Sequence, residues 1–92
     1  METLTITSGV NNVEIEINGG LSINGTKRMS IRKANVVKLR LVDNPQTMDM
    51  IKIHYCDGDS DEIHFTRVTD IDGATPTSND DLYNRLDAIF NA

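Results

Sequence analysis

The chain has 92 residues, of which 38% are hydrophobic, a formal net charge of -5 and one cysteine. This length predicts a single domain whose small core would gain stability from burial against partners, and a lone cysteine excludes an intrachain disulfide. No apolar run approaches the ~20 residues of a membrane-spanning helix, and the amino terminus lacks the features of a secretory signal. We therefore expect synthesis in a reducing cytoplasm and no membrane span.

The first twelve residues are polar and β-branched, with Leu4, Ile6 and Val10 as their strong apolar residues. Two interpretations are open for residues 1–12: an edge strand of the domain, or an arm that pairs with a neighbouring chain by strand addition. In the second interpretation, Leu4 and Ile6 contact a partner.

Alternating apolar and polar residues predict a β body over residues 13–72. Segments 13–17, 36–42 and 50–55 place hydrophobic side chains at every second position, which is typical of strands with one buried face. Residues 28–32 show the same pattern over a shorter length. Turn signals separate these segments. They are Asn18-Gly19, Asn24-Gly25 and Asn44-Pro45.

Charge is distributed unevenly along the chain. Residues 1–42 carry six basic and three acidic side chains, whereas residues 43–92 carry three basic and eleven acidic ones. The overall acidity and the lack of interleaved aromatic residues argue against a nucleic-acid surface. The basic side chains then either decorate a solvated strand face or form one of two opposite-signed surfaces that join the chain to copies of itself or to a neighbour. They are Lys27, Arg28, Arg32, Lys33, Lys38 and Arg40.

The stretch HYCDGDSDEIHF, residues 54–65, contains four acidic residues and both histidines. Its alternating aspartates match the first ligand positions of a helix–loop–helix calcium loop, but Glu62 and Val68 stand where that loop needs glycine and glutamate. A weaker calcium site at this acidic segment is an open alternative. The candidate metal ligands are Asp57, Asp59, Asp61, His54 and His64.

A β-hairpin explains this stretch better than a metal loop. Pairing Ile53 with Phe65 and Tyr55 with Ile63 keeps the apolar residues on one face, and the chain then reverses at residues 58–60. The aspartates lie at the tip of the loop, where they keep it solvated.

The same register places His54 opposite His64 on the outer face of the hairpin. Two imidazoles at that spacing can share a transition-metal ion, but two ligands alone make a weak site, so we interpret them as ordinary surface or interface histidines. Cys56 beside His54 resembles a thiol–imidazole pair, but no oxyanion donors or cofactor loop accompany it. We expect no enzyme, no catalytic residue and no cofactor.

Residues 78–91 carry the pattern of an amphipathic helix. Ser78 is placed to cap its amino terminus, Asp80 and Asp81 complement the helix dipole, and Asp81 is spaced from Arg85 for an ion pair. The apolar stripe either covers a sheet or docks on another subunit. Its members are Leu82, Tyr83, Leu86, Ile89 and Phe90.

These elements predict a mainly β (α+β) domain, with about five to seven short strands in a small antiparallel sheet or sandwich and one carboxyl-terminal amphipathic helix. The expected core follows from the apolar positions of the strands and the helix. It comprises Val13, Ile15, Ile17, Leu39, Leu41, Ile51, Ile53, Tyr55, Ile63, Phe65, Leu82, Leu86 and Ile89.

The segment VTDIDGATPTSNDDLYNRLDAIFNA, residues 68–92, resembles the end of small structural proteins encoded by bacteriophages, notably phages of Bacteroidetes-type hosts. In those proteins a β-rich body ends in a short DG turn and a terminal helix of the form LYNRLDAIF. The resemblance implies a virion component, such as a capsid, decoration, spike-base or tail-connector subunit. It also implies synthesis in the host cytoplasm, and it transfers no catalytic residue.

We therefore expect a non-enzymatic protein that assembles with copies of itself or with other virion proteins and takes no small-molecule substrate. The alternative is a small binding or regulatory module, such as a phage-encoded inhibitor of a host protein. The expected partner contacts come from the amino-terminal segment, the basic segment and the helix. They are Leu4, Ile6, Lys27, Arg28, Arg32, Lys33, Tyr83 and Phe90.

Overall fold

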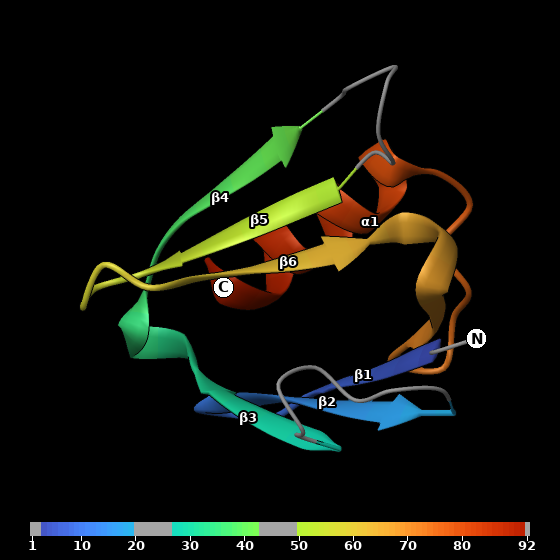
Figure 1. Cartoon of the computed structure of the whole chain (residues 1–92), viewed down its shortest axis with the longest axis horizontal. Coiled ribbons are helices and arrows are strands. Elements are labelled where there is room, and N and C mark those ends of the chain that lie inside the picture. Colours follow the sequence, from blue (N-terminus) through green and yellow to red (C-terminus); the bar gives the residue numbers. More distant parts are fainter. Residues whose placement is uncertain (1–2, 20–26, 43–49, 92) are drawn as a thin grey trace.

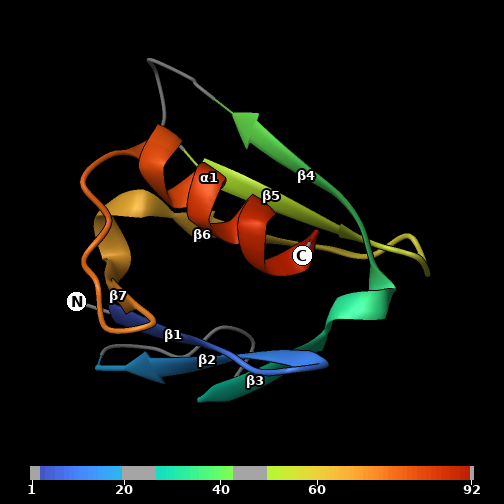
Figure 2. The ribbon, with the colours of Figure 1, turned by 180° about the vertical axis from the view of Figure 1, so that it is seen from behind.

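Two small β-sheets and one α-helix make up the described part of the chain (Figures 1 and 2). The structure is a computed structural model that describes residues 3–19, 27–42 and 50–91. One sheet has the strand order β3-β2-β1-β7 and the other has the order β4-β5-β6. The elements are β1 (Thr3–Ser8), β2 (Asn12–Asn18), β3 (Arg28–Arg32), η1 (Lys33–Asn35), β4 (Val36–Val42), β5 (Met50–Tyr55), β6 (Ser60–His64), η2 (Phe65–Arg67), β7 (Val68–Ile71) and α1 (Asn79–Phe90).

Two 3₁₀ helices carry the chain from one sheet to the other. In the first crossover η1 joins β3 to β4, and in the second η2 joins β6 to β7. Their flanking residues have closely similar backbone angles, because Arg32 and His64 are both extended before the helix and Val36 and Val68 are both extended after it. Each crossover therefore turns a strand out of one sheet and starts a strand in the other.

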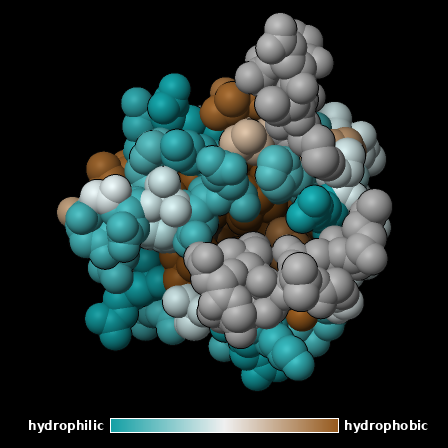
Figure 3. All heavy atoms as spheres, in the orientation of Figure 1, coloured by the Kyte–Doolittle hydropathy of each residue, from teal (hydrophilic) through white to brown (hydrophobic). Residues whose placement is uncertain are grey.

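One hydrophobic core fills the space between the two sheets and under the helix. Both sheets contribute alternate strand residues to this core, and α1 contributes its apolar stripe. The two sheets and the terminal helix confirm the mainly β prediction. In Figure 3 hydrophobic surface is visible in the hollow between the sheets, whereas most of the surrounding face is hydrophilic. The buried members are Leu4, Ile6, Val13, Ile15, Ile17, Ile31, Ile51, Ile53, Ile63, Val68, Ile71, Leu82 and Leu86.

Strand β1 is an interior strand, so both interpretations of residues 1–12 are wrong for residues 3–8. It pairs with β2 on one side and with β7 on the other. Leu4 and Ile6 are 3% and 0% exposed and belong to the core, so they contact no partner from this position. The sequence pattern did not reveal this arrangement because the second neighbour, β7, comes from the far end of the chain.

The sheet that contains β1 is mixed rather than purely antiparallel, because β1 and β7 run parallel. A DG turn follows β7, with positive φ angles of 53° at Asp72 and 85° at Gly73, as a type I′ turn requires. The Asp72 carboxylate accepts hydrogen bonds of 2.7 Å from the backbone N–H and from the hydroxyl of Ser8 at the end of β1. These bonds lower the pKa of Asp72 and tie the turn to β1.

Strand β4 departs from simple alternation. Its pairing with β5 shifts register between Val36 and Lys38, so Val37 forms a bulge. Val37 is 67% exposed and Leu41 is 39% exposed, and Leu39 is half-buried against the core. The prediction of a fully buried face on residues 36–42 is therefore wrong, because β4 pairs only with β5 among the described strands and leaves its outer edge open.

The β5–β6 hairpin forms, but its register differs from the predicted one. Ile51 faces Ile63 and Ile53 faces Asp61. The loop is Cys56-Asp57-Gly58, closed by a 3.1 Å hydrogen bond from the Gly58 N–H to the Tyr55 carbonyl. Gly58 has a φ of 94°, and a three-residue loop needs glycine at this last, left-handed position. In the predicted loop that glycine would come first.

The ends of the remaining elements agree with the turn signals where the structure describes them. Gly19 has a positive φ of 71° directly after β2. Asn24-Gly25 and Asn44-Pro45 lie outside the described residues.

The carboxyl-terminal helix matches its prediction closely. The Ser78 side chain accepts a 3.0 Å hydrogen bond from the Asp81 N–H, and Arg85 donates to Asp81 at 2.9 Å, which lowers the pKa of Asp81. Leu82 and Leu86 are buried, and α1 packs on β4 and β5. The stripe thus covers a sheet of its own chain.

Candidate interaction surfaces

The acidic residues of the 57–62 stretch point in different directions. Asp57 accepts a 3.0 Å hydrogen bond from the Asp59 N–H and so stabilises the tight loop. Asp61 lies on the inner face of the sheet, opposite Ile53, whereas Glu62 lies on the outer face, opposite Lys52. The prediction that all these acids face solvent at a loop tip is wrong for Asp61. Among the residues that the structure describes, no three potential ligands gather to hold a metal ion.

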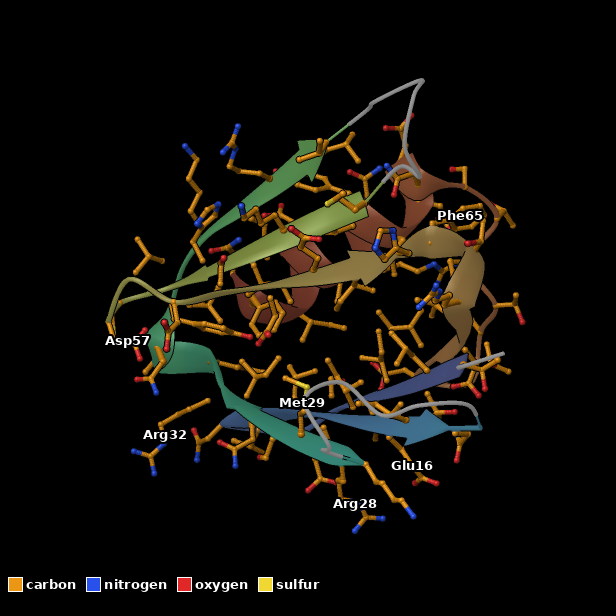
Figure 4. The ribbon with its side chains drawn as sticks, in the orientation of Figure 1. Glu16, Arg28, Met29, Arg32, Asp57 and Phe65 are labelled. Atoms are coloured by element: carbon orange, nitrogen blue, oxygen red, sulfur yellow. The ribbon has the colours of Figure 1, made fainter. Side chains whose placement is uncertain are left out.

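Asp61 faces inward because Tyr55 provides a partner for it. The Tyr55 hydroxyl donates a 2.7 Å hydrogen bond to the Asp61 carboxylate at the wall of a pocket of about 200 Å³. Burial and this hydrogen bond raise the pKa of Tyr55. The pocket lies between the end of β3, η1 and the β5–β6 loop, and Figure 4 marks its surroundings with Met29, Arg32 and Asp57.

Replacing Tyr55 with phenylalanine should lower the free energy of unfolding by about 1.5 kcal/mol, because the half-buried Asp61 carboxylate would lose its charged hydrogen bond. Urea denaturation measures the change. A double-mutant cycle with Asp61→Asn isolates the pair. If Tyr55→Phe lowered the free energy of unfolding equally in the wild type and in Asp61→Asn, the assigned role of the hydrogen bond would be contradicted.

The two histidines do not face each other. His54 lies opposite Ser60 on β6 and opposite Lys38 on β4, and His64 lies opposite Met50. The predicted facing of His54 and His64 is therefore wrong, because the hairpin register shifts the two strands, and with it goes the alternative of a shared metal ion. The backbone N–H of Cys56 donates to the Asn35 carbonyl at 2.8 Å, so the exposed thiol belongs to a structural loop between η1 and β5.

The outer face of the β4–β5–β6 sheet gathers positive charge. Arg40 lies directly opposite Lys52, and Lys38 lies directly opposite His54. We call Lys38, Arg40 and Lys52, the charged residues around His54, the cationic face. Arg40 and Lys52 repel each other as like charges in cross-strand positions. Glu62 lies opposite Lys52 on the β6 side, and an acidic partner would further reduce the repulsion. The alternation of residues 50–55 already puts Lys52 and His54 on the outer side. Their approach to Lys38 and Arg40 depends on the pairing of β5 with β4. That pairing was hard to predict because residues 43–49, between the two strands, contain no simple two-residue turn signal.

The electrostatics of His54 reflect this positive environment. Desolvation lowers the pKa of His54 below its ordinary value of 6.5, and the charges of Lys52, Arg40 and Lys38 lower it further. Glu62 and Ser60 on β6 complete its surroundings on the other side. These surroundings therefore disfavour protonation of His54.

This shift makes stability depend on pH in a defined window. Because the unfolded chain takes up a proton at His54 near pH 6.5 and the folded chain does so only at lower pH, the contribution is complete above pH 6.5 and is lost as the pH falls below it. We expect the urea midpoint to decrease between about pH 7.5 and about pH 5.5. His54→Gln should reduce this slope, and Lys52→Gln should reduce it less. If the urea midpoint of His54→Gln changed with pH as steeply as that of the wild type, the pH dependence would come from other groups.

The basic segment of residues 27–40 does not form one patch. Arg28 lies on the outer face of the other sheet and pairs with Glu16 at 3.5 Å, with both side chains largely exposed. Figure 4 shows Arg28 and Glu16 pointing away from the second sheet, while Met29 points toward it. Lys38 and Arg40 belong to the cationic face because η1 turns the chain from one sheet to the other.

A groove of about 700 Å³ runs between the β1–β2 turn, η1 and the end of α1. We call it the Val10 groove, since Val10 is 90% exposed there. The Lys33 N–H donates to the Asn11 carbonyl at 2.8 Å and fixes η1 against the turn. The groove combines apolar side chains with two cations and contains no acidic lining residue among those described. It is lined by Val10, Asn11, Asn12, Arg32, Lys33, Ala34 and Phe90.

The groove brings together three of the expected partner contacts, Arg32, Lys33 and Phe90. Of the others, Lys27 and Arg28 are exposed elsewhere, and Tyr83 packs half-buried against the core. The sequence interpretation did not single out Val10 as an exposed apolar residue. Its position in the polar segment SGVNN was the available signal, because an apolar side chain between turn residues has no strand face to bury it.

Scans against protein-family models and searches of curated proteins and of solved structures found nothing that matches this chain. Within the described residues, α1 is too short and too polar to cross a membrane.

Proposed function

We propose that the protein is a non-enzymatic subunit of a larger assembly, joined to its neighbours by protein–protein contacts. The Val10 groove carries this proposal, because it places an almost fully exposed valine and the half-buried Phe90 beside Arg32 and Lys33. Apolar anchors with cationic neighbours suit a partner segment that offers an apolar side chain and a carboxylate. The occupant we assign to the groove is such an acidic segment from an adjacent subunit.

The resemblance of residues 68–92 to bacteriophage structural proteins supports a virion as that assembly. A capsid, decoration, spike-base or tail-connector subunit fits a chain of this size, which gains stability by burial against its neighbours. The partners are then other virion proteins or further copies of the chain.

Mass spectrometry of density-purified particles from cells that produce the chain tests the virion. We expect the chain in fixed proportion to the other particle proteins. Its absence from particles, or a one-to-one complex with a host protein in place of particle association, would overturn the virion assignment and favour an inhibitor.

Incorporation of variants into the same particles tests the groove. Val10→Asp should abolish incorporation, because it puts a carboxylate where an apolar side chain and an acidic partner meet. Thr66→Asp is the control, since Thr66 is also exposed but lies in η2, outside the groove. Equal incorporation of the two variants would contradict the assigned role of the groove.

A further inference from the structure

We propose that the chain assembles head to tail, with α1 of one copy seated on the cationic face of the next. This inference rests on the proposed assembly function and names one of its partners, a second copy. The contact uses a surface separate from the Val10 groove.

The acidic side of the contact is the exposed stripe of α1. Asp80, Asn84, Asp87, Ala88 and Asn91 are all exposed, and at 3.6 residues per turn they lie within roughly a third of the helix circumference. The stripe carries two carboxylates and no cation. Arg85, the cation of the helix, lies beside the stripe and pairs with Asp81. Its side chains are short, so they form a low ridge that can approach a sheet closely.

The cationic side of the contact is the outer face of the β4–β5–β6 sheet, whose inner face carries α1. Leu82 and Leu86 hold α1 against β4 and β5, and alternate residues of these strands point away from the helix. In Figure 1 α1 lies behind the β4–β5–β6 sheet, and in Figure 2 it lies in front of it. The cationic face and the acidic stripe thus lie on opposite sides of one protomer.

Opposite-signed surfaces on opposite sides make a heterologous contact. Such a contact adds copies in one direction and forms a ring or a filament. It also covers the outer face of the three-stranded sheet with a neighbour's helix. Val37, exposed beside Lys38, adds apolar area at the rim.

The spacing of the charges fits this contact. Asp80 and Asp87 are seven positions apart, so they are separated by about 10 Å along the helix. Lys38 and Arg40 are separated by about 7 Å along β4, and Lys52 lies across from Arg40 at about 5 Å. The flexible stems of lysine and arginine span the remaining difference.

Analytical ultracentrifugation of charge-swapped variants tests the contact. The wild-type chain should associate at about 50 mM salt and dissociate to a 10.2 kDa monomer at about 500 mM salt. Lys38→Glu with Arg40→Glu should be monomeric at low salt, and so should Asn84→Lys with Asp87→Lys. The helix substitutions avoid the first turn and the core, so the fold is retained. Lys27→Glu, on an exposed residue away from both surfaces, should associate like wild type.

Mixing the two monomeric variants gives the decisive result. Each then meets a complementary surface on the other, so we expect the mixture to regain at least half of the wild-type association at low salt. A monomeric wild-type chain at low salt, or a mixture that stays monomeric, would overturn head-to-tail assembly. Neither outcome touches the Val10 groove, whose role is decided separately by incorporation of Val10→Asp into particles.

Discussion

Replacing Ile6 with alanine should lower the free energy of unfolding by about 3 kcal/mol, although the residue lies in a polar amino-terminal segment. Ile6 is 0% exposed between β2 and β7, so truncation removes buried methyl groups and leaves a cavity. A domain of this size is marginally stable, and such a loss is a large part of its stability. Urea denaturation followed by circular dichroism measures it.

The matched control is Val10→Ala, four residues further along the same segment. Val10 is 90% exposed, so its truncation should change the free energy of unfolding by less than about 0.5 kcal/mol. If residues 1–12 were an arm that pairs only with a partner, Ile6→Ala would also leave the isolated chain unaffected. Equal stabilities of the two variants would therefore contradict the interior position of β1.

Replacing Leu82 with alanine should destabilise the protein by a similar amount, about 3 kcal/mol. Leu82 lies on the buried side of α1 and is 0% exposed. Alanine is the best helix former. The loss therefore reports packing of α1 on the sheet and not helix propensity. Thermal or urea unfolding measures the loss.

Asp87→Ala serves as its control on the exposed side of α1. It should change stability by less than about 0.5 kcal/mol, because the Asp87 side chain is exposed. A small effect of Leu82→Ala, comparable to that of Asp87→Ala, would mean that the helix does not pack on β4 and β5.

Elements built from local patterns could be predicted well from the sequence. Alternation in VEIEI and MIKIHY identified β2 and β5 and their buried isoleucines. Capping by Ser78 and the apolar stripe identified α1. In each case the deciding forces act within one segment, because strand alternation and helix capping need only neighbouring residues.

Features set by pairing between distant segments could not be predicted in the same way. The neighbours of β1, the bulge at Val37 and the split of the basic segment all depend on which strand lies beside which. The hairpin register was missed because Phe65 was treated as a strand residue, whereas it begins η2 and leaves the sheet. The candidate surfaces share this dependence, since the cationic face forms only when β4 and β5 pair.

The parallel pairing of β1 with β7 also constrains how the protein is made. Strand β1 is translated some sixty residues before its second neighbour, β7. Until then Leu4 and Ile6 stay uncovered along one edge, so the nascent chain cannot complete this sheet during most of its synthesis. Such long-range closure slows folding and prolongs exposure of an unpaired strand.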